Sequence, residues 1–321
     1  TTYVMGSAAW YIEPHAYIVV ARDGNSGTNG GVTADITFGD MPLLDPAGNM
    51  ITLTMPGSPD VTVDIVMWDS SFNLQHDKSL SFSPGALALD MEALNDDAVH
   101  WCYSKYSTFG LGDFGTPGAQ NDDCLVDWCN LQWPATTSVN QFATTEIIYG
   151  RVYEGSSTVG AGQGQFIVGQ VGYGTINTPA SASWTWFDAT YGADYDGLVP
   201  GGLENDEYEA TMDPTILGTF DYAYRFSFDG GLSWTYCDQS GSGDGYQVAD
   251  AGEITVLPEA PKLFISQYME GSSVNKAIEV YNNTGSNYTL NQCMLLFYFN
   301  GNTSAGASIT LSAVSLASGD T

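Results

Sequence analysis

The sequence predicts an all-β protein made of small β-sandwiches. Its 321 residues include 37 Gly, 19 Tyr and 8 Trp, and short β-branched and aromatic runs alternate with turn residues. That pattern is typical of strands joined by tight connections. Helical character is confined to one expected turn, at residues 90–98. A chain of this length holds two or three such domains, each large enough to bury a core.

The middle block, residues 122–257, is expected to form a complete two-sheet sandwich. Seven short runs with turn-rich connections follow one another there, as such a sandwich requires. Tyr222, Tyr224, Phe226 and Phe228 alternate with smaller or polar residues and so share one face of their strand. The predicted strands are 126–134, 146–153, 166–174, 183–187, 207–212, 218–227 and 252–256.

One segment of the middle block resembles a known module. The run Gly230-Gly231-Leu232-Ser233-Trp234-Thr235-Tyr236-Cys237-Asp238 is similar to immunoglobulin-like modules that accompany lamin tail domains in large secreted bacterial proteins. The resemblance implies an immunoglobulin-like β-sandwich in this block and implies no catalytic activity.

The two ends of the chain resemble the two halves of one lamin tail domain, itself a small immunoglobulin-like β-sandwich. Residues 263–281, two apolar runs around a polar turn, resemble its first hairpin. The run at 12–22 resembles its central strand, and the Thr-Pro-Gly segment at 113–121 resembles its closing segment. The halves stand in reversed order. The resemblance implies three blocks: 1–121, the C-terminal portion of a lamin-tail-like domain; 122–257, the complete sandwich; and 258–321, the N-terminal portion.

Charge limits the partners of the chain. Seven Lys and Arg residues stand against 37 Asp and Glu residues, a formal net charge of -30. Such a surface argues against binding nucleic acid or an anionic membrane. No apolar run approaches the roughly 20 residues that span a bilayer, so we expect no membrane insertion. The start of the chain lacks signal-peptide features, so we expect either a removed leader or a start inside a longer protein.

Five cysteines in an acidic β-rich chain favour an oxidising compartment, so we expect an extracellular or cell-surface protein. Cys129 and Cys237 are expected to join distant edges of the middle sandwich. Cys102 and Cys124 flank the Thr-Pro-Gly turn and are expected to fasten the domain junction. The Cys129–Cys237 bridge would close a long loop and contribute about 2 to 4 kcal/mol to stability. Cys293 is then left over, either as a buried thiol or with an intermolecular role.

Oxygen-rich turns make Ca²⁺ the one cofactor that the sequence favours, and no cofactor is expected to be required. Asp194, Asp196, Asp206 and Glu207 supply the hard ligands that Ca²⁺ prefers. They lack the spacing of an EF-hand, and Asp, Asn and Gly are also ordinary turn residues. A cation site and plain surface carboxylates both stay open.

Aromatic residues offer a second candidate site. Trp184, Trp186, Tyr191 and Trp234 could stack on sugar rings, which makes carbohydrate a candidate partner. Alternating aromatic residues in a β-sandwich are more often core or interface.

Catalytic motifs are missing from the sequence, which has no G-x-S-x-G elbow, no H-E-x-x-H and no P-loop. Pairs of carboxylates are uninformative in a chain this acidic. We therefore expect a protein that is not an enzyme.

Two functions remain. The first is a structural subunit of an extracellular filament or surface array, in which copies of the chain complete each other's split sandwich by strand addition. The second is a binding or accessory region of a larger secreted hydrolase or nuclease. We favour the first, because half a sandwich exposes apolar faces that need a partner. The expected assembly residues are Phe264, Ile265, Ile278, Val280, Leu295, Phe297 and Phe299 in the last block and Tyr17 and Val19 in the first.

Overall fold

The structure, a computed structural model, describes residues 12–37, 39, 48–72, 74, 78–87, 89, 92–195, 204–259, 262–317 and 319. It divides into two compact units, Thr1–Leu257 and Pro258–Thr321. Strands dominate both units, in agreement with the predicted all-β class. No helix within these ranges has the length and hydropathy of a membrane span. The predicted boundary after residue 121 lies inside the first unit and stays a prediction.

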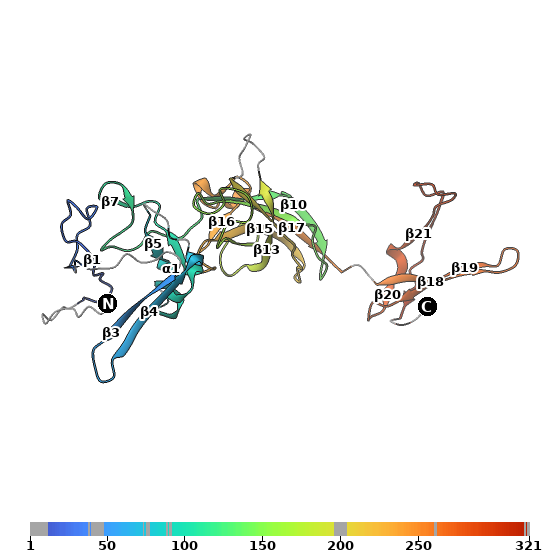
Figure 1. Ribbon diagram of the computed structural model, residues 1–321. Coiled ribbons are helices and arrows are strands. Elements are labelled where there is room, and N and C mark those ends of the chain that lie inside the picture. The colour runs from blue at the N-terminus through green and yellow to red at the C-terminus, as the bar shows by residue number, and fades with distance from the viewer. Residues whose placement is uncertain are drawn as a thin grey trace. The chain divides into compact units, whose positions relative to one another are not determined.

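Nine strands in the middle of the chain form one large mixed sheet (Figure 1). The order is β10-β17-β15-β12-β13-β14-β11-β9, and β16 also pairs with β15. All neighbours are antiparallel except β10 and β17. The strands are β9 (Trp128–Trp133), β10 (Thr136–Asn140), β11 (Ile148–Tyr153), β12 (Val168–Thr175), β13 (Thr185–Tyr195), β14 (Asn205–Ala210), β15 (Gly218–Ser227), β16 (Thr235–Cys237) and β17 (Gly252–Leu257).

The long strand β13 connects the two parts of this sheet. Its residues 185–189 pair with β12, and residues 190–195 pair with β14. Between Tyr191 and Ala193 the register with β14 shifts, and such a bulge bends a strand. The curl brings β9, at one end of the strand order, against β15 and β16.

This arrangement differs from the predicted two separate sheets. The strand predicted at 183–187 stops before Asp188 and Gly192, which are residue types that strands disfavour. The strand continues through them: Asp188 pairs with Gln170 of β12, and Gly192 lies in the bulge opposite β14, so a single strand serves both parts of the sheet. Pairing with β12 and β14 thus outweighs the low strand propensity of Asp188 and Gly192.

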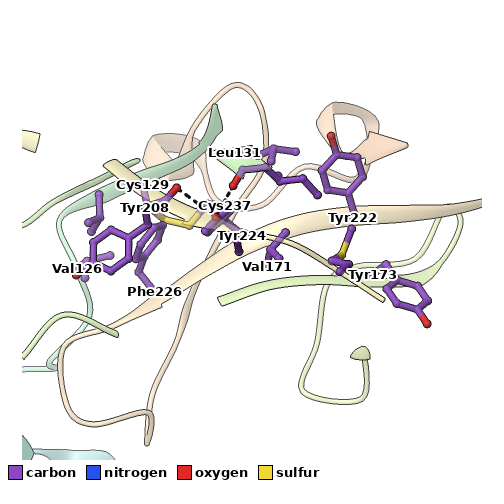
Figure 2. Close-up of a cluster of buried hydrophobic side chains, with 14 of the residues drawn as sticks. Val126, Cys129, Leu131, Val171, Tyr173, Tyr208, Tyr222, Tyr224, Phe226 and Cys237 are labelled. Carbon is purple, nitrogen blue, oxygen red and sulfur yellow. Dashed lines mark hydrogen bonds between the residues drawn. A yellow bond between two sulfur atoms is a disulfide. The ribbon is translucent and has the colours of Figure 1, made fainter. Parts of the chain in front are cut away.

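The core of the first unit lies inside the curled sheet (Figure 2). Tyr222, Tyr224 and Phe226 are fully buried on one face of β15, which confirms their predicted alternation. Tyr224 donates its hydroxyl hydrogen to the carbonyl of Ile148 at 2.7 Å. Its ring packs against Gly150, where a Cβ would lie 2.5 Å from a ring carbon. Further core side chains are Leu131, Val152, Val171, Tyr208, Met212 and Ile254.

The first part of the same unit consists of short two-stranded sheets. The longest is a hairpin of β3 and β4, and both of its faces expose apolar side chains, such as Met50, Ile51 and Leu53 at about half of their surface. The elements are β1 (Val20–Ala21), β2 (Ile36–Thr37), β3 (Gly48–Met55), β4 (Val61–Asp69), η1 (Ser70–Phe72), β5 (Leu80–Phe82), α1 (Pro84–Leu87), η2 (Glu92–Asp96), η3 (Ala98–His100), β6 (Trp101–Tyr103), β7 (Thr108–Phe109) and β8 (Asp113–Phe114).

Two expectations for this part are wrong. The strand predicted at 12–22 is reduced to Val20–Ala21, because a turn closed by the bond from the Ala16 N–H to the Glu13 carbonyl occupies its start. The helical turn predicted at 90–98 is present in its described residues as the 3₁₀ turn η2, but a second 3₁₀ turn, η3, follows it and the α-helical turn α1 precedes it, so helical character is not confined to 90–98. The side chain of Asp97 caps the second turn by accepting from the Val99 N–H.

The second unit contains three two-stranded sheets. They pair β18 with β19, β20 with β23, and β21 with β22. Among its described residues only Asn282 and Leu316 are buried. The Asn282 side chain donates to the carbonyls of Ser286 and Leu316 and so ties the sheets together. The elements are β18 (Leu263–Glu270), β19 (Lys276–Asn282), β20 (Tyr288–Thr289), η6 (Leu290–Gln292), β21 (Met294–Phe297), β22 (Ala307–Thr310) and β23 (Ser315–Leu316).

Two 3₁₀ turns of the first unit, η4 (Ser242–Asp244) and η5 (Val248–Asp250), lie between β16 and β17.

Candidate functional site

Two tryptophans lie flat against glycines at the β12–β13 hairpin. A Cβ on Gly172 would lie 2.4 Å from the Trp186 ring, and one on Gly174 would lie 2.3 Å from the Trp184 ring. The two indoles stack with centroids 6.0 Å apart and planes 19° from parallel. The glycines of β12 thus make the flat surface on which the tryptophans of β13 rest.

A hollow of about 370 Å³ opens at the end of this hairpin. Its apolar wall is made by Tyr173, Trp184, Ile216 and Phe220, and its polar wall by Thr175, Thr178, Ser181, Ser183 and Thr185. Trp184 is 8% exposed, so it offers the hollow an edge rather than a full face. Its indole N–H has no acceptor among the described residues. Apolar rings beside hydroxyl groups fit a ligand with apolar faces and a polar rim.

Arg225 occupies the faces of two other predicted stacking residues. Its guanidinium carbon lies 4.2 Å from the Trp186 ring centroid and 4.0 Å from that of Trp234. Its Nε donates to Gln170 Oε1 at 2.8 Å, and desolvation lowers the pKa of the guanidinium. Tyr191 lies elsewhere on β13, with its ring against Tyr208. Of the four aromatic residues predicted to bind sugar, only Trp184 lines the hollow.

An acidic pair lies on the neighbouring strands β13 and β14. Asp194 and Asp206 are directly opposite in the antiparallel register. Asp206 is fully buried, and its Oδ2 accepts the Gly164 N–H at 2.6 Å. Desolvation raises the pKa of Asp206 to about 6; the Gly164 bond opposes the rise and Asp194 adds to it. Tyr191 donates to Asp194, which raises the pKa of that tyrosine to about 12.

The predicted calcium ligands are only partly brought together. Asp194 and Asp206 meet, whereas Glu207 follows Asp206 on its strand and therefore points to the other face. Asp196 lies outside the described residues. No group of three or more His, Cys, Asp or Glu side chains arranged for a metal ion occurs in the described part of the chain.

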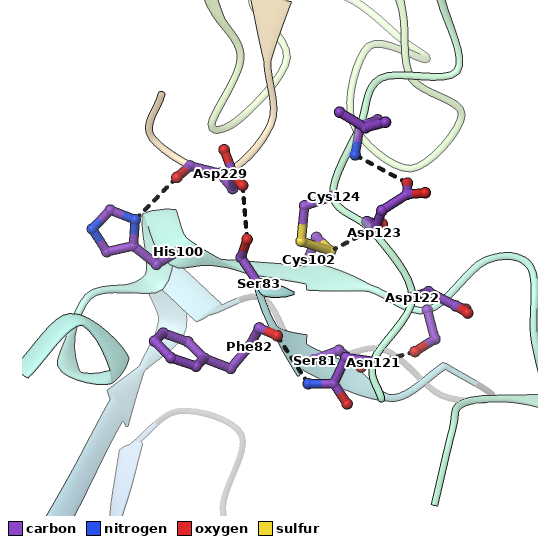
Figure 3. The surroundings of a disulfide bond; sticks show 12 residues. Ser81, Phe82, Ser83, His100, Cys102, Asn121, Asp122, Asp123, Cys124 and Asp229 are labelled. Carbon is purple, nitrogen blue, oxygen red and sulfur yellow. Dashed lines mark hydrogen bonds between the residues drawn. A yellow bond between two sulfur atoms is a disulfide. The ribbon is translucent and has the colours of Figure 1, made fainter. Parts of the chain in front are cut away.

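Both predicted disulfides are present, Cys102–Cys124 and Cys129–Cys237. Cys293 forms no disulfide and is half-buried. Figure 3 shows the first bridge beside a buried carboxylate, Asp229, that links the first part of the unit to the large sheet. Asp229 accepts the hydroxyl hydrogen of Ser83 at 2.7 Å, from a strand end 146 residues away.

A partly buried ion cluster, which sequence analysis missed, strengthens the same junction. Lys105 Nζ lies 2.6 Å from Glu154 Oε2 and 2.9 Å from Asp127 Oδ1. Desolvation acts to lower the pKa of Lys105, but the two carboxylates outweigh it and raise the pKa. The three residues are far apart in sequence and follow no motif, so only the fold shows that they meet.

The predicted assembly residues are surface residues to different degrees. Phe264, Ile265 and Phe299 are 50%, 60% and 52% exposed. Ile278, Val280, Leu295 and Phe297 are half-buried within their hairpins. In the first unit Tyr17 is 43% exposed and Val19 half-buried, and both precede β1. The exposed members leave an unpaired apolar surface on the second unit.

Comparison with known proteins gives one partial similarity. The chain is 30% identical over 150 residues to an amylopullulanase of Thermoanaerobacter thermohydrosulfuricus. The similarity covers 41% of this chain and 9% of that enzyme, so the chain corresponds to less than a tenth of its length. No family model matches the chain. Together with two disulfides, which are typical of oxidising compartments, the similarity indicates a secreted protein.

Proposed function

We propose that the chain is a non-catalytic accessory region of a larger secreted polysaccharide hydrolase. The similarity to a small part of an amylopullulanase carries this proposal, because it matches the chain to 9% of a much longer enzyme. In this proposal the curled middle sheet is an immunoglobulin-like module and the flanking parts are lamin-tail-like. The module holds or presents substrate and takes no part in bond cleavage.

The hollow at the β12–β13 hairpin supports a carbohydrate ligand of the starch or pullulan type. A glucose ring has apolar faces and a hydroxyl rim, which match the rings of Tyr173, Trp184 and Phe220 and the hydroxyls of Ser181 and Ser183. The two serine oxygens lie 2.8 Å apart and can bridge neighbouring sugar hydroxyls. The indole N–H of Trp184, which has no acceptor among the described residues, would supply a further donor.

Affinity electrophoresis tests this proposal. The chain should migrate more slowly in gels that contain pullulan or amylopectin, and Trp184→Ala should abolish the retardation. Trp184→Phe should weaken it less, since a ring remains while the N–H is lost. Trp133→Ala is the matched control, because Trp133 is 53% exposed on β9 and does not line the hollow. Unretarded migration of the unmodified chain in both gels would remove the carbohydrate proposal.

A second candidate is assembly through the split sandwich, which the exposed second unit favours. A two-stranded hairpin is marginal in water by itself, yet this unit is built from three such pairs. Residues 258–321 carry four acidic and two basic side chains, so this part is close to neutral in a strongly acidic chain. Copies of the chain could therefore meet here without the full charge repulsion.

Truncation separates the two candidates. Removing residues 262–321 should leave the curled sheet folded and should abolish any filaments seen by electron microscopy. Adding the separate 262–321 peptide should then order the hairpin of β3 and β4. Filaments that form equally well from the truncated chain would exclude assembly through this unit.

A further inference from the structure

Two carboxylates of like charge face each other across β13 and β14. Asp194 and Asp206 are direct cross-strand partners, so their side chains lie on one face of the sheet. Like charges directly opposite are destabilising, and burial of one of them makes the repulsion stronger. Asp206 is fully buried. The pair therefore needs a compensating positive charge.

One oxygen of this pair has no partner. Asp206 Oδ1 is buried and accepts no hydrogen bond from any described residue. Two other fully buried aspartates show how the chain normally treats such groups. Asp229 and Asp238 each accept hydrogen bonds on both carboxylate oxygens. Asp206 departs from this pattern. Its unpaired Oδ1 is costly, because an unpaired buried polar atom destabilises the fold by about 1 to 3 kcal/mol.

Basic side chains do not supply the missing charge within the described ranges. The ion pairs there use Lys105, Lys262 and Lys276, and none involves Asp194 or Asp206. Arg151 pairs in register with Glu207 and lies over the rings of Trp128 and Tyr195, so it serves the opposite face of β14. With seven Lys and Arg in the whole chain, a cation from solution is the natural counter-charge.

We propose that Asp194 and Asp206 bind one divalent cation, Ca²⁺, with Asp206 Oδ1 as a direct ligand. Carboxylate oxygens are the ligands that Ca²⁺ prefers, and water completes its shell at sites with few protein ligands. The site excludes Glu207, which the sequence pattern grouped with it. This inference does not depend on carbohydrate binding or on assembly.

The loop before β12 fixes the remaining oxygens of the pair. The Gly162 N–H donates to both oxygens of Asp194, at 2.9 and 3.1 Å, and the Gly164 N–H donates to Asp206 Oδ2. At Gly164 a Cβ would lie 3.1 Å from Asp206 Oδ2 and 3.0 Å from a Thr158 methyl carbon, so glycine permits the close approach. A bound cation would hold this loop against β13 and β14. Calcium should therefore order the loop as well as stabilise the sheet.

Thermal unfolding of the full chain at neutral pH, with chelator or with millimolar CaCl₂, tests the proposal. Calcium should raise the midpoint by about 2 to 4 °C in the unmodified chain, because it binds only the folded state. Glu207→Gln, the control on the opposite face, should keep the full shift. Asp206→Asn should lose it. General screening of the acidic surface would raise all three midpoints equally, and that result would overturn the site.

Terbium luminescence gives a readout that does not depend on stability. Tb³⁺ bound at the pair would be sensitised by Tyr191 and Tyr208, whose rings lie 6.1 Å apart beside it. Emission should fall in Asp194→Asn and in Asp206→Asn and should stay unchanged in Glu207→Gln. Calcium should displace the terbium. A midpoint that responds to pH but not to calcium, or terbium emission that both Asn variants retain, would mean that a proton rather than a cation neutralises the pair.

Discussion

The curled middle sheet and the second unit are both built from strands rich in apolar and aromatic residues, but they bury those residues to different extents. Tyr224 in the middle sheet is fully buried, with its hydroxyl bonded to the Ile148 carbonyl. Tyr268 in the second unit also lies in a strand, β18, and is 60% exposed. The difference teaches that alternation specifies a face, while burial depends on what the sheet closes against. The nine-strand sheet curls until β9 packs against β15 and β16, whereas an isolated pair of strands has no such surface to pack against.

The largest expected effect comes from the long-range disulfide of the middle sheet. Replacing Cys129 and Cys237 with Ala should lower the free energy of unfolding by about 4 to 5 kcal/mol, at or above the upper end of the range expected from the sequence, because the bridge closes a loop of 108 residues. Removing Cys102–Cys124, which spans 22 residues, should cost about 3 kcal/mol. Urea unfolding of the two double variants measures both. An equal or larger loss for the shorter loop would contradict the chain-entropy explanation.

The second unit should not respond to either change. It contains no disulfide among its described residues, and Cys293 is its one cysteine. Resonances of β18 and β19 in an NMR spectrum should therefore keep their positions in both variants. Movement of those resonances would show that the second unit depends on the folded middle sheet, and would weaken the contrast between the two regions.

Much of the middle sheet could be predicted from the sequence. The predicted strand at 218–227 matches β15, and its buried face was identified from Tyr222, Tyr224 and Phe226. Strand β10 was missed, because Thr136–Asn140 is short and polar and pairs in parallel with a strand more than 100 residues away. Pairing of that kind leaves no local signal. The continuation of β13 beyond residue 187 was missed as well, because Asp188 and Gly192 are residue types that strands disfavour.

Matched tyrosine substitutions sharpen the comparison between the regions. Tyr224→Ala should lower the free energy of unfolding by about 3 to 5 kcal/mol, since it leaves a cavity and unpairs the Ile148 carbonyl. Tyr268→Ala should change it by about 0.5 kcal/mol or less, because the ring is largely in water. Chemical unfolding followed by far-UV circular dichroism suits both, because all eight tryptophans of the chain lie before residue 258 and none would report on the second unit. A large loss from Tyr268→Ala would mean that this surface is covered by a partner in solution.

The candidate site was less predictable than the fold. Aromatic residues were identified by type, yet Arg225 fills the space between Trp186 and Trp234 and leaves Trp184 to line the hollow. Of the predicted oxygen ligands, Asp194 and Asp206 are cross-strand partners, whereas Glu207, the neighbour of Asp206 in sequence, is not part of that pair. Strand alternation at the known register separates Glu207 from the pair. Knowledge of the register was the missing information.

Acid should distinguish the two regions by a smaller effect, through Asp122 in the first unit. Desolvation acts to raise the pKa of Asp122, but bonds from Ser107, Tyr106 and Lys105 outweigh it and lower the pKa below its usual range. Asp122 Oδ2 accepts the backbone N–H groups of all three residues, and Oδ1 accepts the Ser107 hydroxyl. A lowered folded-state pKa means that this stabilisation is present above the unfolded pKa of about 3.9 and is lost as the pH falls through the folded value.

Asp122→Asn tests this account by removing the charge while it keeps the shape of the side chain. At pH 7 the variant should be less stable by about 1 kcal/mol, a modest value because Asp122 is partly exposed and solvent screens it. The difference in stability should shrink as the pH falls from about 3.9, the unfolded pKa, through the lower folded pKa. Below the folded pKa the wild-type carboxyl group is neutral, like the amide of the variant. Urea midpoints at pH 7 and at acidic pH, measured for both chains, give the comparison. A constant difference across the pH range would place the effect in packing rather than in charge. We expect no corresponding change in the second unit, because Glu259 and Glu270 pair with Lys262 and Lys276 at the surface and Glu279 accepts a hydrogen bond from the exposed Ser266 hydroxyl.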